Sequence, residues 1–151
     1  MTLPPARPLA QRVEDTLHRL THDVDAWVAT AGPGGMPYQM PLSFLWDGST
    51  LLLSTATGNP TSVNLLANPA IRLALGGTRD VVLVEGTVEA ATPAGEIPAD
   101  VGDAFAVKAG FDPREARGSY HYFRVRPRSV QAWREVNELP GRDLMRDGRW
   151  L

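Results

Sequence analysis

Residues 51–69 read LLLSTATGNPTSVNLLANP, and this stretch decides the fold that we expect. An apolar strand runs into a Ser-Thr pair, a Gly-Asn-Pro turn follows, and a short helix over 60–67 ends before an Asn-Pro pair. Because a helix N-terminus carries partial positive charge and unpaired N–H donors, this order of residues can hold an anion. The simpler interpretation is a strand, a turn and a helix capped by Asn59 or Thr61. The surrounding sequence has to decide between the two.

Short strand signals surround this stretch on both sides. An amphipathic helix over 6–21 comes first, because leucine and valine recur there at helical spacing, and a further helix is expected over 94–109. The strand candidates are 26–31, 36–46, 50–56, 71–75, 80–90, 120–125 and 129–133. Strands and helices do not alternate as βαβ units. The sequence therefore predicts a mainly β fold, an antiparallel barrel or sandwich with helices at its ends, and argues against a doubly wound sheet.

Glycine and proline positions mark the turns and bends of these strands. Asp47-Gly48 predicts a tight hairpin, and Asp147-Gly148 predicts a second small hairpin in the tail. Gly86 lies inside the longest strand candidate and indicates a bulge or bend. Pro41 removes a ladder donor, so its strand is expected to be bent or to lie at an edge, and Pro127 is expected to separate the last two strands.

Composition excludes several classes of protein. The chain has 151 residues, enough for one domain with one core. Its net charge of −2 predicts no nucleic-acid partner, and no apolar run is long enough to predict a membrane span. Without cysteine there is no disulfide and no thiolate zinc site, and we expect no metal site. The first residues carry charges where a signal peptide needs an apolar segment, so we expect a cytoplasmic protein.

Several motifs together resemble those of one protein family. In chain order they are Met40-Pro-Leu-Ser-Phe-Leu-Trp-Asp-Gly, Leu53-Ser-Thr, Asn64-Leu65 with Asn68-Pro69, Val84-Glu-Gly-Thr-Val, and Arg126-Pro127 followed by Trp133. With these motifs the chain resembles the pyridoxamine 5'-phosphate oxidase-like, FMN-binding split-barrel proteins, including their flavin/deazaflavin oxidoreductase branch. The resemblance covers most of the chain. It divides the chain into an N-terminal arm and helix over 1–24 and a split-barrel flavin-binding domain over 25–151.

The resemblance implies a six-stranded antiparallel split barrel that forms a homodimer and binds a flavin in clefts between the subunits. It places Thr55 near the cofactor phosphate and Asn64 on the helix that follows. It also places Trp133 on the last core strand, from which the partner subunit reaches the cleft. Together with the polar groups around the helix N-terminus, the expected cofactor-binding residues are Met40, Pro41, Leu42, Ser43, Ser54, Thr55, Asn59, Thr61, Ser62, Asn64 and Trp133.

The chain departs from this family at the phosphate end of the expected site. Family members that bind FMN tightly usually carry basic residues where this chain has Pro60 and Thr61, and no cation lies between Asp47 and Arg72. A phosphate dianion loses more from the absence of a lysine than the singly charged phosphodiester of a deazaflavin does, because the Coulomb energy scales with charge. The expected cofactor is therefore FMN or a deazaflavin (coenzyme F-420), with the deazaflavin bound at least as well.

The expected activity is that of a flavin- or deazaflavin-dependent oxidoreductase, with hydride transfer to or from a small substrate. The cofactor carries out the redox step in such an enzyme, so no catalytic side chain is assigned. Two alternatives remain open. One is a non-enzymatic binder or carrier of a flavin or haem, and the other is a structural homodimer whose cofactor site has decayed. The missing phosphate lysine favours the second of these.

Overall fold

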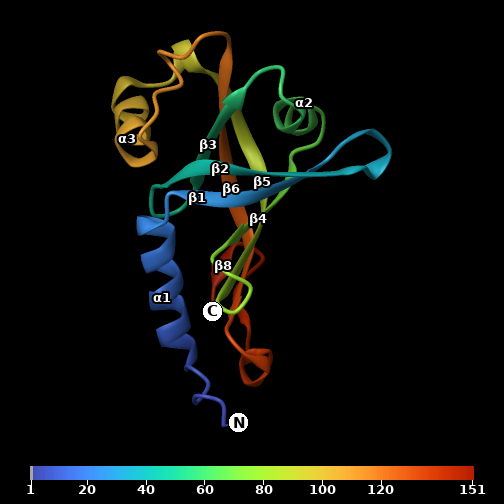
Figure 1. The fold of residues 1–151 in the computed structure, drawn as a ribbon, viewed down its shortest axis with the longest axis vertical. Coiled ribbons are helices and arrows are strands. Elements are labelled where there is room, and N and C mark those ends of the chain that lie inside the picture. The colour runs from blue at the N-terminus through green and yellow to red at the C-terminus, as the bar shows by residue number, and fades with distance from the viewer. Residues whose placement is uncertain (1) are drawn as a thin grey trace.

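Six strands close into an antiparallel barrel, as the resemblance implies (Figure 1). The computed structural model describes residues 2–151, so Met1, the first residue of the expected arm, lies outside it. The barrel strands are β1 (Asp25–Ala31), β2 (Pro37–Trp46), β3 (Leu51–Ala56), β4 (Ala70–Leu75), β5 (Val81–Pro93) and β6 (Tyr120–Trp133). Their order in the sheet is β3-β2-β1-β4-β5-β6, and the pairing of β3 with β6 closes it.

Helices and one small hairpin complete the fold. They are α1 (Leu9–His22), α2 (Pro60–Ala67) and α3 (Ala99–Ala109), the 3₁₀ turns η1 (Pro33–Gly35), η2 (Ala94–Glu96) and η3 (Val136–Glu138), and the tail strands β7 (Asp143–Arg146) and β8 (Arg149–Trp150). The tail hairpin is confirmed. Asp147 and Gly148 at its turn have φ of 53° and 77°, values that a type I′ turn requires. Within residues 2–151, no helix is both long and apolar enough to cross a membrane.

Two of the predicted element boundaries are wrong. The helix expected over 94–109 is a 3₁₀ turn, η2, followed after Ile97-Pro98 by α3. The residue before a proline is disfavoured in the helical region, so the break falls at this pair. The last two core strands are one continuous strand, β6. Pro127 lies opposite Gly86, where the β5–β6 register shifts. The ladder is interrupted at such a bulge, so the backbone N–H that proline lacks is not needed there and the strand can continue through Pro127. The bulge expected at Gly86 is thus confirmed.

Most of the buried apolar side chains form one cluster in and around the inside of the barrel. Alternate residues of the strands point inward and are almost fully buried, among them Val28, Phe44, Leu53, Leu73 and Phe123. A second, smaller cluster lies outside the barrel, under α3. Its buried members are Leu52, Ala94, Phe105 and Tyr122. This smaller cluster holds α3 against the outer face of β3 and β6, and that position matters for the site described below.

Two arginines fasten α1 to the segment that follows β6. The buried Arg12 donates through Nη1 to the carbonyl oxygens of Ala132, Glu138 and Gly141, at 3.3, 2.7 and 3.2 Å. Arg7 forms a two-pronged ion pair with Glu138, with Nε–Oε1 and Nη2–Oε2 distances of 2.9 and 2.8 Å. Guanidinium groups remain charged and donate several hydrogen bonds each. The two arginines therefore provide partners for buried carbonyl oxygens and for the buried Glu138 carboxylate, which would otherwise have none.

Replacing Gly86 with alanine tests the bulge. A Cβ atom at this position lies 2.6 Å from Val125 Cγ1 and 3.0 Å from the Arg126 carbonyl oxygen. We expect Gly86→Ala to lower the free energy of unfolding by about 1–3 kcal/mol, the usual cost of overpacking a core. Gly95→Ala is the control, because a Cβ there meets nothing within 4 Å. Equal urea midpoints for the two variants would contradict the close packing at Gly86.

The Arg7–Glu138 pair predicts a loss of stability in acid. Hydrogen bonds from the Arg7 guanidinium, outweighing burial, lower the pKa of Glu138 from 4.5 to about 2. A lowered folded-state pKa stabilises the fold above the ordinary value, and this stabilisation disappears as the pH falls from 4.5 towards about 2. We expect the free energy of unfolding to drop by about 2–3 kcal/mol over this window. Urea unfolding of Glu138→Gln should show a shallower acid dependence, and an equally steep one would contradict the assignment.

Candidate functional site

The barrel wall opens between β2 and β3. The ladder between these strands spans three residue pairs, from Trp46–Leu51 to Phe44–Leu53. Before Phe44, β2 pairs with β1, and after Leu53, β3 pairs with β6. The two strands therefore diverge from the Phe44–Leu53 pair, which forms the narrow end of a split. The wide end lies at the N-terminus of α2.

The β2 edge of the split carries free backbone groups. Phe44 donates its N–H to the Val24 carbonyl oxygen at 3.0 Å, so its backbone faces the β1 side. Because backbone groups alternate in direction along a strand, the N–H and C=O of Ser43 face the opposite way, into the split. Pro41 has the same orientation two residues earlier. Its missing N–H therefore costs no ladder hydrogen bond, which explains why proline is tolerated in this strand.

The β3 edge lies across the split from the β2 edge and carries a similar set of free backbone groups. Thr57 donates its N–H to the Ser119 carbonyl oxygen at 2.8 Å and so faces the β6 side. By the same alternation, the backbone groups of Ser54 and Ala56 point into the split. The Ala56 carbonyl oxygen is occupied, since it accepts from Ser62 Oγ at 2.7 Å. The split is thus bordered on both sides by strand edges that hold backbone donors and acceptors.

A cavity of about 340 Å³ occupies the split. Its lining comes from β1, β2, β3, the turn before α2, α3 and the start of β6: Asp25, Met40, Pro41, Leu42, Ser43, Ser54, Thr55, Ala56, Asn59, Phe105, Phe111 and Tyr120. Met40, Pro41, Leu42, Ser43, Ser54, Thr55 and Asn59 are seven of the eleven residues expected from the sequence to bind a cofactor. The structure therefore brings most of the expected set together around one cavity, within one chain.

At the wide end, polar groups gather around the start of α2. Asn59 occupies the N-cap position, but its Nδ2 donates to Thr55 Oγ1 at 2.9 Å. The expectation that Asn59 or Thr61 caps the helix is thus wrong, and none of the described side chains caps α2. The first-turn N–H groups of the helix are left without a side-chain acceptor. The hydroxyl of Thr61 is buried and has no hydrogen-bond partner within residues 2–151.

The remaining expected residues do not line this cavity. Thr61 and Ser62 are fully buried in the first turn of α2. Asn64 turns towards β1, where its Nδ2 donates to Thr30 Oγ1 at 3.1 Å. Trp133 lies at the far end of β6, in a separate hollow beside Arg79. A single chain therefore does not bring Trp133 to the split, and its expected role depends on a partner subunit.

The sequence missed the residues that roof the cavity. Phe105 and Phe111 come from α3 and the loop after it, and Tyr120 begins β6. Phe105 is held in place by an edge-to-face contact with Tyr122, with ring centroids 5.4 Å apart. No local pattern places α3 over a split about fifty residues earlier in the chain. In the sequence, the one available signal was the alternation of Tyr120 and Tyr122 along β6, which places these two tyrosine rings on the same face of the strand.

Charge is confined to the narrow end of the cavity. Asp25 is the one charged residue of the lining, and its Oδ1 accepts from Ser43 Oγ at 2.7 Å. Lys108 does not line the cavity: its Nζ donates to the Phe44 carbonyl oxygen at 3.3 Å, on the β1 side of β2. Burial lowers the pKa of Lys108, and the carboxylates of Asp23 and Asp25 oppose this effect. The wide end offers hydroxyls and N–H groups, whereas the narrow end holds the carboxylate of Asp25.

Comparison with known proteins now decides the family. Residues 18–134 match the profile of the pyridoxamine 5'-phosphate oxidase family, which is more than half of the chain. The chain belongs to this family. The match covers the whole barrel, including both edges of the split and all three elements that meet at its roof. No curated protein matches this family member in sequence.

Solved structures share the fold. An F420 reductase is 22% identical, with 75% of this chain and 93% of that protein covered and a TM-score of 0.61. A candidate pyridoxamine 5'-phosphate oxidase from Listeria innocua is 16% identical, with 82% and 97% covered and a TM-score of 0.62. An FAD-binding protein from Mesorhizobium loti is 18% identical, with 80% and 90% covered and a TM-score of 0.59. At these identities the likeness establishes the fold alone.

Proposed function

We propose that this protein binds a flavin-type cofactor in the split between β2 and β3 and transfers hydride between that cofactor and a small substrate. The observation that carries this proposal is the pair of facing strand edges. Ser43 on one side and Ser54 on the other present backbone donors and acceptors across a cavity of about 340 Å³. A planar heterocycle with alternating N–H, N and C=O groups along its edge is a suitable partner for such edges.

The residues of the cavity fit the parts of such a cofactor. The aromatic roof of Phe105, Phe111 and Tyr120 supplies flat apolar surface for a ring system. The hydroxyl of Thr55 and the first turn of α2 supply uncharged donors for a phosphate at the wide end. When bound, the cofactor supplies the hydride chemistry. The chain orients it, excludes water and hydrogen-bonds its ring.

The charge of the wide end favours a singly charged phosphodiester over a phosphate dianion. Among residues 2–151, no cation lines the cavity. Arg72 and Arg79, the arginines nearest in sequence on the C-terminal side, pair with Glu85 and Glu135 on the surface. We therefore propose that a deazaflavin of the coenzyme F-420 type binds at least as well as FMN.

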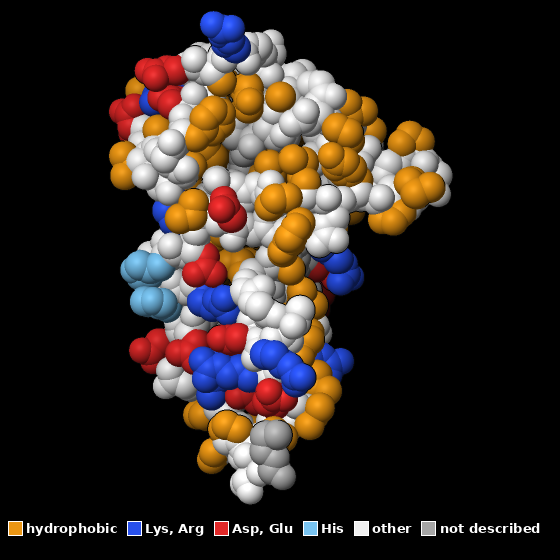
Figure 2. All heavy atoms as spheres, viewed as in Figure 1, with side chains coloured by type: hydrophobic (Ala, Val, Ile, Leu, Met, Phe, Trp, Pro, Cys, Tyr) orange, Lys and Arg blue, Asp and Glu red, His pale blue; other side chains and the backbone are white. Residues whose placement is uncertain are grey.

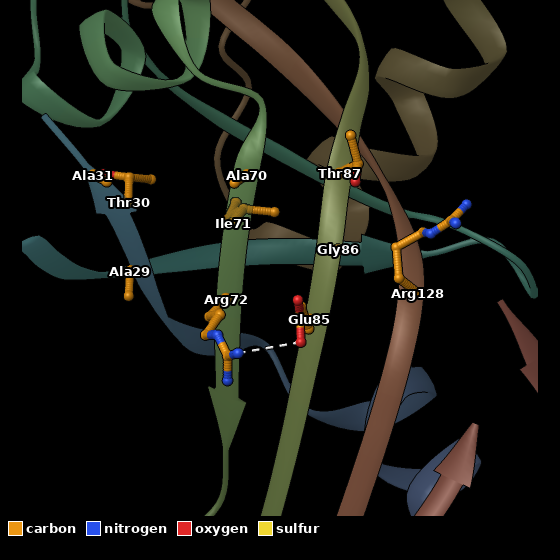
Figure 3. Close-up of a pocket in the computed structure, with 10 residues that line it drawn as sticks. All are labelled: Ala29, Thr30, Ala31, Ala70, Ile71, Arg72, Glu85, Gly86, Thr87 and Arg128. Atoms are coloured by element: carbon orange, nitrogen blue, oxygen red, sulfur yellow. Dashed lines mark hydrogen bonds and ion pairs between the residues drawn. The ribbon is translucent and has the colours of Figure 1, made fainter. Parts of the chain in front are cut away.

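We also propose that the protein works as a homodimer. The outer face of β1, β4 and β5 is hollowed by about 330 Å³ and is lined by small side chains such as Ala29 and Ala70 (Figure 3). Arg72 and Glu85 form an ion pair across it, and Trp27 on the same face of β1 is 51% exposed. A large aromatic side chain beside small ones on an uncovered sheet face is typical of a subunit interface.

Figure 2 shows that charged and apolar side chains gather on different parts of the surface. On the face shown, charged side chains gather over the lower half of the molecule, whereas apolar side chains gather on the upper half and on the projecting β1–β2 hairpin. Met36 on that hairpin is largely exposed, as are Val63 and Leu66 on α2. These apolar side chains surround the end of the barrel at which the split opens. A second subunit seated there would cover them.

Cofactor titration tests the proposed function. We expect the wild-type protein to bind the deazaflavin at least as tightly as FMN, measured by fluorescence titration. Thr55→Val should weaken either cofactor about fivefold, the effect of one hydrogen bond of about 1 kcal/mol. Thr57→Val is the control, because Thr57 Oγ1 bonds His121 Nδ1 at 2.9 Å, outside the cavity lining. A protein that binds neither cofactor would contradict the proposal. Cofactor binding without turnover would favour the alternative of a non-enzymatic carrier.

Sedimentation tests the homodimer. We expect a dimer at low micromolar concentration, because obligate interfaces commonly bury more than about 2,000 Å². Trp27→Arg should shift the protein towards monomer, since it places a charge on the proposed interface. Val107→Arg on the exposed face of α3 is the control and should leave the dimer intact. A folded wild-type monomer at these concentrations would overturn the assignment.

A further inference from the structure

A second hollow adjoins the cavity of the split. It measures about 240 Å³ and runs from β2 across β1 to the end of β4. Its lining consists of Asp25, Ala26, Trp27, Pro41, Ala74 and Gly76. Asp25 and Pro41 belong to the lining of the split cavity as well, so the two spaces meet along these residues. We call the second one the side hollow.

The strand register explains the shape of the side hollow. Trp27 lies opposite Pro41 on β2 and opposite Ala74 on β4. Residues that lie opposite each other in antiparallel strands share a face of the sheet, and the half-exposed Trp27 shows that this is the outer face. The small residues Ala74 and Gly76 stand beside the large indole ring. They leave a depression with an aromatic wall, next to the narrow end of the split.

The carboxylate of Asp25 faces both spaces with unused acceptor capacity. Its Oδ1 accepts one hydrogen bond, from Ser43 Oγ at 2.7 Å. Within residues 2–151 it forms no ion pair, whereas Asp23 pairs with Arg19 and Glu138 pairs with Arg7. A carboxylate has about four acceptor positions, so most of those on Asp25 remain available to a ligand.

Two cations lie near Asp25, and neither lines the split cavity or the side hollow. Lys108 is close enough for Asp25 to act on it electrostatically, but its Nζ is bonded to a backbone carbonyl of β2. The guanidinium of Arg19 approaches the side hollow from α1 and is held in ion pairs with Asp23 and Asp80. Among residues 2–151, Asp25 is thus the one charged side chain in either lining.

We propose that the side hollow binds the substrate, and that this substrate is an organic cation with a flat apolar body. The inference rests on the proposed function, because it seats the substrate beside a cofactor held in the split. The face of Trp27 and the carboxylate of Asp25 are the two kinds of group that stabilise a cation together. An anion of the same shape meets a carboxylate and no cation in the lining, so it is repelled.

The proposed homodimer strengthens this recognition. Trp27 belongs to the sheet face that we assign to the subunit interface, so a second subunit there would partly cover the side hollow. Such a cover reduces the screening of the Asp25 carboxylate by solvent and increases its attraction for a cation. The experiments below therefore use Asp25 and Ala74, and leave Trp27 unchanged.

Three ligands of nearly the same shape test the charge preference. Benzamidine is a planar cation, benzamide is neutral and benzoate is an anion. We expect NMR titration of the wild-type protein to show that benzamidine binds about fivefold more tightly than benzamide, with benzoate the weakest. Saturation with FMN, or with the deazaflavin if it binds more tightly, should not displace benzamidine, because the side hollow lies beside the split.

Two variants with matched controls locate the ligand. Asp25→Asn keeps an acceptor for Ser43 and should lower the affinity for benzamidine to that for benzamide. Its control, Glu115→Gln, removes an exposed carboxylate outside both linings and should keep the wild-type order. Ala74→Leu fills the side hollow and should weaken benzamidine about tenfold. Its control, Ala104→Leu, adds the same volume on α3 beside a different hollow and should leave the affinity unchanged.

Each outcome bears on the proposal. Equal wild-type affinities for the three ligands overturn it, and so does tighter binding of benzoate. Displacement of benzamidine by the cofactor, or unchanged affinity in Ala74→Leu, places the ligand elsewhere and also overturns it. If Asp25→Asn does not fold, the wild-type order and Ala74→Leu still decide. A charge order that persists in a protein binding no flavin defeats the proposed function alone, and flavin binding without the charge order defeats this inference alone.

Discussion

The closure of the barrel through β3 and β6 is the constraint on which the site depends. β3 pairs with β6 over its entire length, and β2 pairs with β1 from Pro37 to Ser43. The other edges of β2 and β3 face each other but pair over only three residue pairs, because beyond Phe44–Leu53 β2 stays with β1 and β3 stays with β6. The split is therefore a consequence of how the sheet closes. Its backbone groups are free because their strands are fully paired on the other side.

The elements around the split give it two different ends. The wide end is uncharged: it offers the hydroxyl of Thr55 and the first turn of α2. The narrow end holds the carboxylate of Asp25. Such an arrangement suits a long ligand with chemically distinct ends more than a compact ion. The arginines are numerous in the sequence, and most of them hold elements of the fold together. Arg7 and Arg12, for example, bind α1 to the chain after β6.

Membership of the pyridoxamine 5'-phosphate oxidase family is compatible with several chemistries, since a fold does not dictate its reaction. In this chain the neutral wide end and the carboxylate of Asp25 at the narrow end are the features that can set it apart. Both are properties of particular side chains on a common scaffold. Cofactor choice can then vary between family members without any change in how the barrel closes.

The resemblance to a known family, and not a local pattern, indicated seven of the residues around the cavity. The sequence by itself determined the mainly β class, the turns at Asp47-Gly48 and Asp147-Gly148, and the bulge at Gly86. These follow from local periodicity and turn chemistry, which neighbouring residues encode. Only the tertiary structure decided that β6 continues through Pro127, that Asn59 bonds Thr55 instead of capping α2, and that α3 brings Phe105 to the split. Those outcomes depend on packing between segments that are far apart in the chain. Which of several possible partners a side chain or backbone group binds is known only once the fold has brought those segments together.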